Sequence, residues 1–171
     1  MGKPINGSDL MLFIDSTGEG TAFKSIAFAT SHSLSISAET VETSSKDTGG
    51  KCFSTDDENV WMGVTVTRSS EKKRLEDLKR NIKAKHYHVT FEPIFDEIGE
   101  IDFAGIDWVV IGTETGHRKG KVDSRLEWVL HIADQAQIQG VPVFMKEDLL
   151  PIMGEERMIQ ELPEQFTKRI Q

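Results

Sequence analysis

The stretch from Asp107 to Gly116, DWVVIGTETG, has the residue types and spacing that best suit chemistry. Apolar and β-branched residues fill its first half, which predicts a strand buried on both faces. The run then ends in Gly-Thr-Glu-Thr-Gly, a small polar loop. In α/β folds, binding and catalytic groups gather in the loops at the C-terminal ends of parallel strands. We therefore expect this loop to form part of a site.

Two histidines and a glutamate are the candidate ligands for a metal. His86 and His88 are two positions apart on a predicted strand, so they share one face, and Glu92 lies further along that face. Imidazole and carboxylate groups bind zinc, so a His-His-Glu site is one interpretation. The interpretation we favour is that both histidines are ordinary surface or core-edge groups, and we predict no metal site.

Nucleophilic and phosphate-binding motifs are weak or missing. Cys52 is the single cysteine, and one thiol cannot by itself hold a zinc ion or an iron–sulfur cluster, which need about three or four protein ligands. The sequence has no Ser-His-Asp order and no nucleophile elbow. The basic loop from Gly116 to Lys121 resembles a phosphate loop only loosely, and a plain basic loop is the interpretation we favour.

The composition is typical of a soluble globular protein, with 37% hydrophobic and 28% charged residues in a chain of 171. A formal net charge of −8 argues against broad attraction to nucleic acid or to an anionic membrane. Apolar runs of roughly 18 residues and a signal-type N-terminus are both absent from the sequence. We expect a cytoplasmic protein that has no membrane partner and does not bind nucleic acid.

The second part of the chain, from about Asp56, alternates predicted strands with predicted helices. Helical spacing of apolar residues indicates one helix that begins near Ser69 and a second that begins at a capping box and stops at Gly140. Lysine and arginine cover the outer side of the first helix, and a solvated face is favoured over a phosphate site. Strands are expected at residues 59–66, 87–94, 107–111 and 141–146. The helix positions expected to be buried are Leu75, Leu78, Ile82, Leu126, Val129, Leu130 and Ala133. The capping box is formed by Ser124 and Glu127. This alternation favours parallel, right-handed βα units.

The first part of the chain has a different pattern. Short apolar runs at residues 10–14 and 25–30, followed by period-two alternation from His32 to Ala38, indicate three short strands. No helical periodicity separates them, so we expect an antiparallel meander rather than part of a parallel sheet.

Together these patterns predict an α/β protein, a partial (half) β/α barrel with parallel strands, preceded by a small antiparallel β hairpin or meander. Four strands and two full crossover helices fall short of an eight-stranded barrel, which takes about 250 residues. The expected division is a β-rich segment at residues 1–51 and a half-barrel at residues 52–171. Because an open half-barrel leaves sheet edges exposed, self-association is expected.

The first segment resembles the N-terminus of phage major tail (tail-tube) proteins through INGSDLMLFID and FATSHSLSISAETVETSSKDTGGK. The resemblance covers roughly the first 50 residues. It implies a β-sandwich or barrel that stacks as hexameric rings, and hence tail assembly as a partner and the virion as a location.

The second segment resembles the C-terminal half of a phage-associated family of radical-SAM-like barrel proteins of unknown function. The resemblance covers about 115 residues and rests on NVWMGVTV, HVTFEPIFDEIGEIDFAGIDWVVIGTETG, QAQIQGVPVFMKEDL and GEERMIQELPEQF. It implies that the C-terminal sheet edge holds an iron–sulfur cluster and S-adenosylmethionine. The ligand-binding residues implied by the resemblance are Glu92, Gly112, Thr113, Glu114, Gly116 and Lys146.

The sequence departs from that family at the cluster. The cluster is carried by three closely spaced cysteines, and only Cys52 is present. We therefore predict a phage-derived, non-catalytic or degenerate module with no catalytic residue and no cofactor. The alternatives are a tail-tube structural protein that acts through its N-terminal strands, and an enzyme fragment completed by a partner chain.

Overall fold

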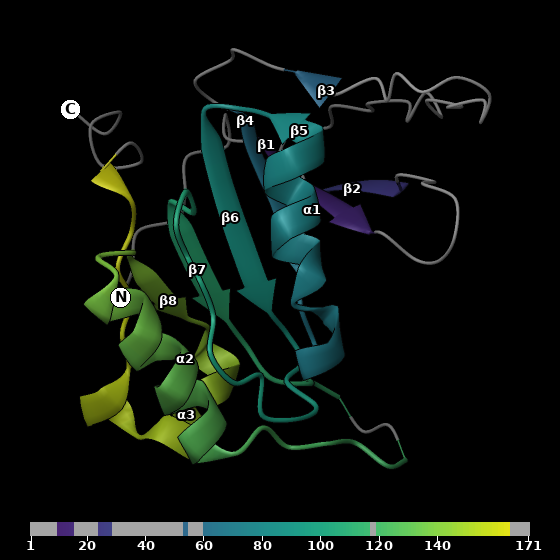
Figure 1. Ribbon diagram of the computed structural model, residues 1–171. Helices are drawn as coiled ribbons and strands as arrows, with labels where there is room; N and C mark the ends of the chain where they lie inside the picture. The colour runs from purple at the N-terminus through teal and green to yellow at the C-terminus, as the bar shows by residue number, and fades with distance from the viewer. Residues whose placement is uncertain (1–9, 16–23, 29–52, 55–59, 117–118, 165–171) are drawn as a thin grey trace.

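A six-stranded sheet forms the centre of the computed structural model, which describes residues 10–15, 24–28, 53–54, 60–116 and 119–164 (Figure 1). The strand order is β2-β1-β4-β6-β7-β8. These strands are β1 (Leu10–Asp15), β2 (Lys24–Phe28), β4 (Val60–Thr65), β6 (His86–Phe91), β7 (Trp108–Ile111) and β8 (Val143–Met145). A separate short pair joins β3 (Phe53–Ser54) to β5 (Ile82–Lys83).

Five of the six strands pair in parallel and follow one another in chain order. This confirms the predicted α/β fold, because parallel strands that lie side by side in chain order have the topology of part of a β/α barrel. β2 pairs antiparallel with β1, but β1 also pairs parallel with β4. β1 therefore extends the parallel sheet. This corrects the expectation that the first part of the chain forms a meander that is not part of that sheet. The predicted strand at residues 32–38 lies outside the described residues.

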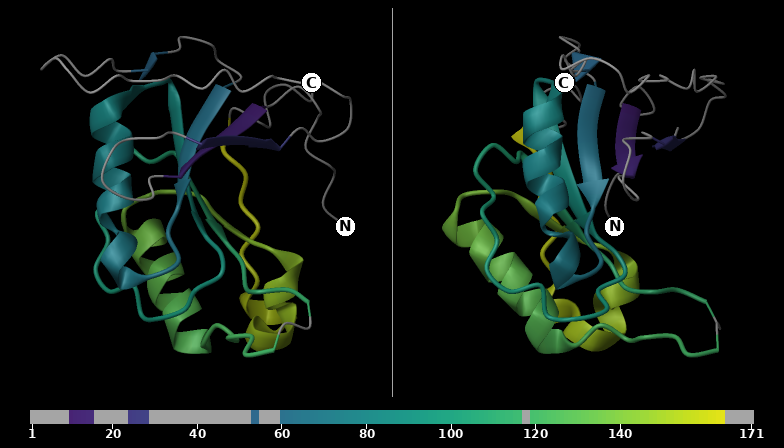
Figure 2. Two further views of the ribbon diagram at one scale, coloured as in Figure 1. Left: turned by 90° about the vertical axis from the view of Figure 1, so that its right-hand side faces the viewer. Right: turned by 45° about the vertical axis from the view of Figure 1, so that its right-hand side comes forward.

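Two helices cover one face of the sheet, called here the helix face. They are α1 (Lys73–Asn81) and α2 (Leu126–Ile138), and Figure 2 shows both on the same side of the strands. Their buried side chains pack against those strand residues that point toward them, among them Val64, Val89, Phe91, Val109, Ile111, Val143 and Met145. The predicted burial of Leu75 and Leu78 is confirmed. Ile82 is also buried, but it lies in β5, so the helix is shorter than predicted.

The start of α2 differs from the predicted capping box. Its N-cap is Arg125, which makes no side-chain cap hydrogen bond. Ser124 is instead buried, and its hydroxyl donates to Thr113 Oγ1 at 3.1 Å. The serine thus fixes the loop after β7 rather than the helix terminus.

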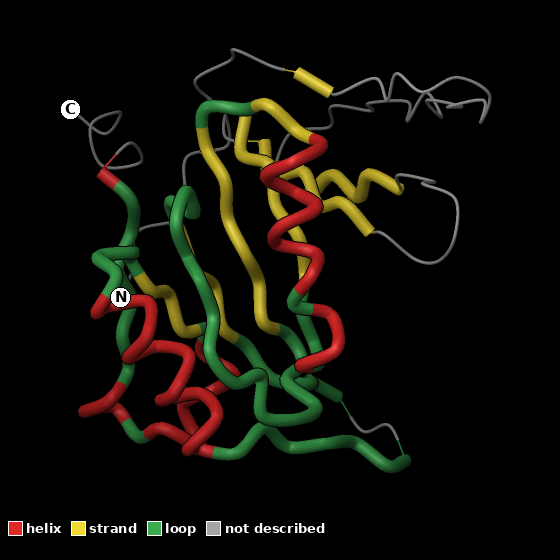
Figure 3. The backbone as a smooth tube through the Cα atoms, viewed as in Figure 1, coloured by secondary structure: helices red, strands yellow, loops and turns green. Residues whose placement is uncertain are grey.

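An extended segment, not a helix, connects β6 to β7 across the helix face (Figure 3). Its backbone polar groups need partners, because it is partly buried. Two glutamines of α2 provide them. Gln135 accepts from Ile101 N at 2.7 Å and donates to Gly99 O at 3.2 Å. Gln139 accepts from Phe103 N at 2.8 Å and donates to Ile101 O at 2.9 Å.

Replacing Gln135 by leucine should lower the free energy of unfolding by about 2 kcal/mol, because the buried Ile101 amide loses its acceptor. Urea unfolding measures this change. The matched control is Gln137→Leu, since Gln137 is on the same helix and is exposed. An equal effect of both substitutions would contradict the role given to Gln135.

The opposite face of the sheet, called here the aromatic face, carries Trp61, His86, His88, Trp108 and Phe144. Alternation along the strands places these residues together. Trp108 contacts Trp61 and Phe144 edge-on, with ring centroids 6.3 and 6.0 Å apart. The segment after α3 (Leu150–Met153) passes the outer edge of β8, where Met145 N donates to Ile159 O at 2.7 Å.

Within the described ranges, no helix combines the length and apolar character that crossing a bilayer requires.

Candidate functional site

Three of the residues implied by the family resemblance meet at the C-terminal edge of the sheet. Glu92 follows β6, Gly112 follows β7 and Lys146 follows β8, and these three strands are neighbours. Lys146 Nζ donates to Glu92 Oε1 at 2.5 Å across 54 residues of sequence. The two side chains therefore reach toward each other from the strands that flank Gly112.

Gly112 is needed because both charged side chains lie over it. A Cβ at this position would be 2.8 Å from Glu92 Cδ and 3.0 Å from Lys146 Cδ. The ladder stays regular up to this point, since Gly112 N donates to Phe91 O and Lys146 N donates to Ile111 O, both at 2.9 Å. The ion pair therefore lies directly over the backbone of Gly112.

The ion pair is partly open to solvent. The side chain of Glu92 is 26% exposed and that of Lys146 is 41% exposed. A pair this exposed contributes roughly 0–1 kcal/mol to stability, because water screens it and the long side chains lose entropy. A ligand with suitable charges can therefore replace the pair at a small cost to the fold.

The other three residues build the loop after β7. Thr113 is buried and accepts hydrogen bonds from Ser124. Glu114 Oε2 accepts from Val122 N at 3.3 Å. Gly116 has a φ of +90°, a conformation that favours glycine. The structure thus brings Glu92, Gly112 and Lys146 together. Thr113 and Glu114 shape the loop through hydrogen bonds, and Gly116 does so through its backbone conformation.

One layer deeper on the aromatic face lies Thr90, which is not among the site residues predicted from the sequence. It lies on β6, two residues before Glu92, and its register partners are Thr65 on β4 and Val110 on β7. Thr90 is 7% exposed. The sequence feature that could have identified Thr90 is its spacing of two residues from Glu92, because residues two apart on a predicted strand share a face.

The two histidines of the predicted strand, His86 and His88, lie deeper still. His86 stacks on Trp61 with ring centroids 4.5 Å apart. His88 is fully buried, and this burial lowers its pKa to about 3 because the charged form loses hydration. The residues that the structure describes include no group of three potential metal-ligating side chains. Both histidines are more buried than the favoured surface or core-edge interpretation implies.

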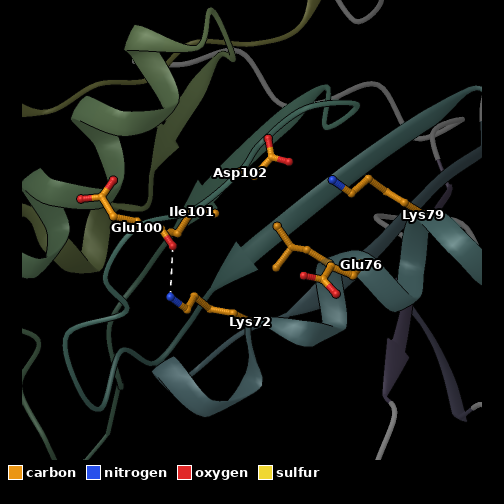
Figure 4. A pocket seen from close by; sticks show the side chains of 7 residues that line it. Lys72, Glu76, Lys79, Glu100, Ile101 and Asp102 are labelled. Atoms are coloured by element: carbon orange, nitrogen blue, oxygen red, sulfur yellow. Dashed lines mark hydrogen bonds between the residues drawn. The ribbon is translucent and has the colours of Figure 1, made fainter.

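A hollow away from this site lies between α1 and the connection from β6 to β7 (Figure 4). Lys72 Nζ donates to Glu100 O at 3.1 Å, and Lys79 Nζ donates to Ala104 O at 2.9 Å. These two lysines thus hold the connection against the helix. The hollow is lined by charges of both signs, which point to no one class of ligand.

A comparison with protein families gives one match, and no curated protein or solved structure matches the chain. The matching family is described as a protein of unknown function, DUF5131. The match covers residues 17–154, which includes Glu92, Gly112 and Lys146 as well as β2 from the first predicted segment. With well over half of its length matched, the chain belongs to the DUF5131 family.

Proposed function

We propose that this chain is a non-catalytic, radical-SAM-like α/β module that binds a small zwitterion at the C-terminal edge of its sheet. The observation that supports the proposal is the ion pair between Glu92 and Lys146 over Gly112. The pair offers one anionic and one cationic group side by side. An α-amino-acid head group carries the complementary charges on two groups bonded to the same carbon.

Binding is an exchange of partners. The ligand ammonium donates to Glu92 in place of Lys146, and Lys146 donates to the ligand carboxylate in place of Glu92. Each new hydrogen bond joins charged groups, so each contributes about 1.5–3 kcal/mol where water is excluded. Gly112 allows the head group to approach the backbone, because no Cβ stands between the two side chains.

The iron–sulfur cluster of the resembled family does not fit this chain. Such a cluster needs at least three cysteine ligands, and the sequence has only Cys52, which lies outside the described residues. The proposal is therefore ligand binding without radical chemistry.

Calorimetric titration of the full chain with S-adenosyl-L-homocysteine tests the proposal. This stable probe carries an amino-acid head group, and 5′-methylthioadenosine has the same nucleoside and a thioether without that head group. We expect binding of the first and much weaker binding of the second. Glu92→Gln and Lys146→Met should each weaken binding at least about tenfold, because each removes one charged hydrogen bond.

Matched controls separate the site from general charge effects. Glu147 is the exposed neighbour of Lys146, and Lys83 is exposed on β5, ahead of the start of β6. Glu147→Gln and Lys83→Met make the same chemical changes and should leave the affinity within about twofold. Equal losses in the site and control variants, or no heat of binding in the wild type, would refute the proposal.

A further inference from the structure

The hydroxyl of Thr90 is in an environment that costs stability, which suggests that it has a role in binding. Its Oγ1 is buried and has no hydrogen-bond partner within the part of the chain that the structure describes. A buried polar atom in this state destabilises the fold, because it loses its hydrogen bonds to water. Most such atoms in native proteins are paired, so this one needs an explanation.

Thr90 lies one layer of side chains before the ion pair. It is on β6, two residues before Glu92, which follows the strand, and its β7 neighbour on the aromatic face is the apolar Val110. Gly112 lies two residues beyond Val110 and adds no side chain above this layer. A ligand that separates Glu92 from Lys146 over Gly112 would therefore lie next to the layer of side chains that contains the Thr90 hydroxyl.

We propose that the Thr90 hydroxyl is the deep contact of this site and donates a hydrogen bond to the ligand carboxylate. This inference rests on the proposed function and specifies its ligand class as carboxylate-bearing amino acids. A carboxylate has two oxygens, so one can accept from Lys146 while the other accepts from Thr90. The ammonium of the ligand is taken by Glu92, which leaves the hydroxyl free to act as a donor.

Thr90→Val tests this assignment, because valine keeps the shape of threonine and lacks its hydroxyl. Affinity for S-adenosyl-L-homocysteine should fall about tenfold, and Thr90→Ser should stay within about twofold of wild type. The analogue that lacks the carboxylate, 5′-(3-aminopropylthio)-5′-deoxyadenosine, should bind wild type and Thr90→Val equally. Without ligand, Thr90→Val should melt a few degrees higher, since the buried hydroxyl has been removed.

The outcomes distinguish this inference from the proposed function. If Glu92→Gln loses affinity and Thr90→Val does not, the role of Thr90 is wrong and the proposed function stands. An equal loss by Thr90→Val for both ligands would also refute the role, because the hydroxyl would not be reading the carboxylate. If the wild type binds neither ligand, both proposals fail.

Discussion

Substituting Gly63 by alanine is expected to lower the free energy of unfolding by about 3 kcal/mol or more. A Cβ at this position would lie 2.2 Å from His88 Nε2 and 2.3 Å from His88 Cε1. The histidine ring cannot move aside easily, because His88 is fully buried on the same face as Trp61 and Trp108, which are 1% and 2% exposed. Overpacking at a rigid site forces the strands apart.

A double-mutant cycle measured by urea unfolding isolates this contact. His88→Ala removes the ring, so Gly63→Ala should be much less damaging in that background than in the wild type. Gly120→Ala is the control, since Gly120 has a φ of +79° and open space around it, and it should cost only about 1 kcal/mol. Additive effects of Gly63→Ala and His88→Ala would show that the ring does not set the cost.

Much of this fold could be predicted from the sequence, because local patterns determine it. Alternation and length distinguish the strands from the helices, and parallel pairing brings the C-terminal ends of the strands to one edge. The expectation that Glu92, Gly112 and Lys146 share that edge follows from this rule together with the family resemblance. The contact between Glu92 and Lys146 could not be predicted from these patterns alone, because it also requires β6, β7 and β8 to be neighbours in the sheet.

Other features could not be predicted, because long-range partners override local signals. Ser124 has the spacing of a helix cap, but burial against Thr113 gives its hydroxyl a different partner. Ile82 continues the apolar stripe of α1, yet the chain becomes extended at that residue and pairs with β3. The glutamine contacts to the connection before β7 could not be predicted either, because Gln135 and Gln139 lie 34 and 36 residues from Ile101 and Phe103, whose amides they accept from.

As the pH is lowered, this protein should begin to lose stability at pH values well above the usual pKa range of carboxylates, because His88 is buried. Its pKa is lowered from 6.5 to about 3 by burial, so the folded state keeps the ring neutral while the unfolded state binds a proton. The stability contributed by the neutral ring is therefore complete above pH 6.5 and is lost as the pH falls toward 3. The loss is about 1.4 kcal/mol per pH unit, or about 2 kcal/mol at pH 5.

The pH dependence can be assigned to His88 by comparison with His88→Gln, which has no group that titrates in this range. The substitution lowers stability at every pH, but it should also flatten the slope of the free energy of unfolding between pH 6.5 and 5. His131→Gln is the matched control, since His131 is partly exposed on α2 beside Glu97 and Glu100, and it should leave most of the slope in place. If the slope is unchanged in His88→Gln, the ring is not held neutral in the folded state, and the tight contact between His88 and Gly63 would have to accommodate a charged imidazole.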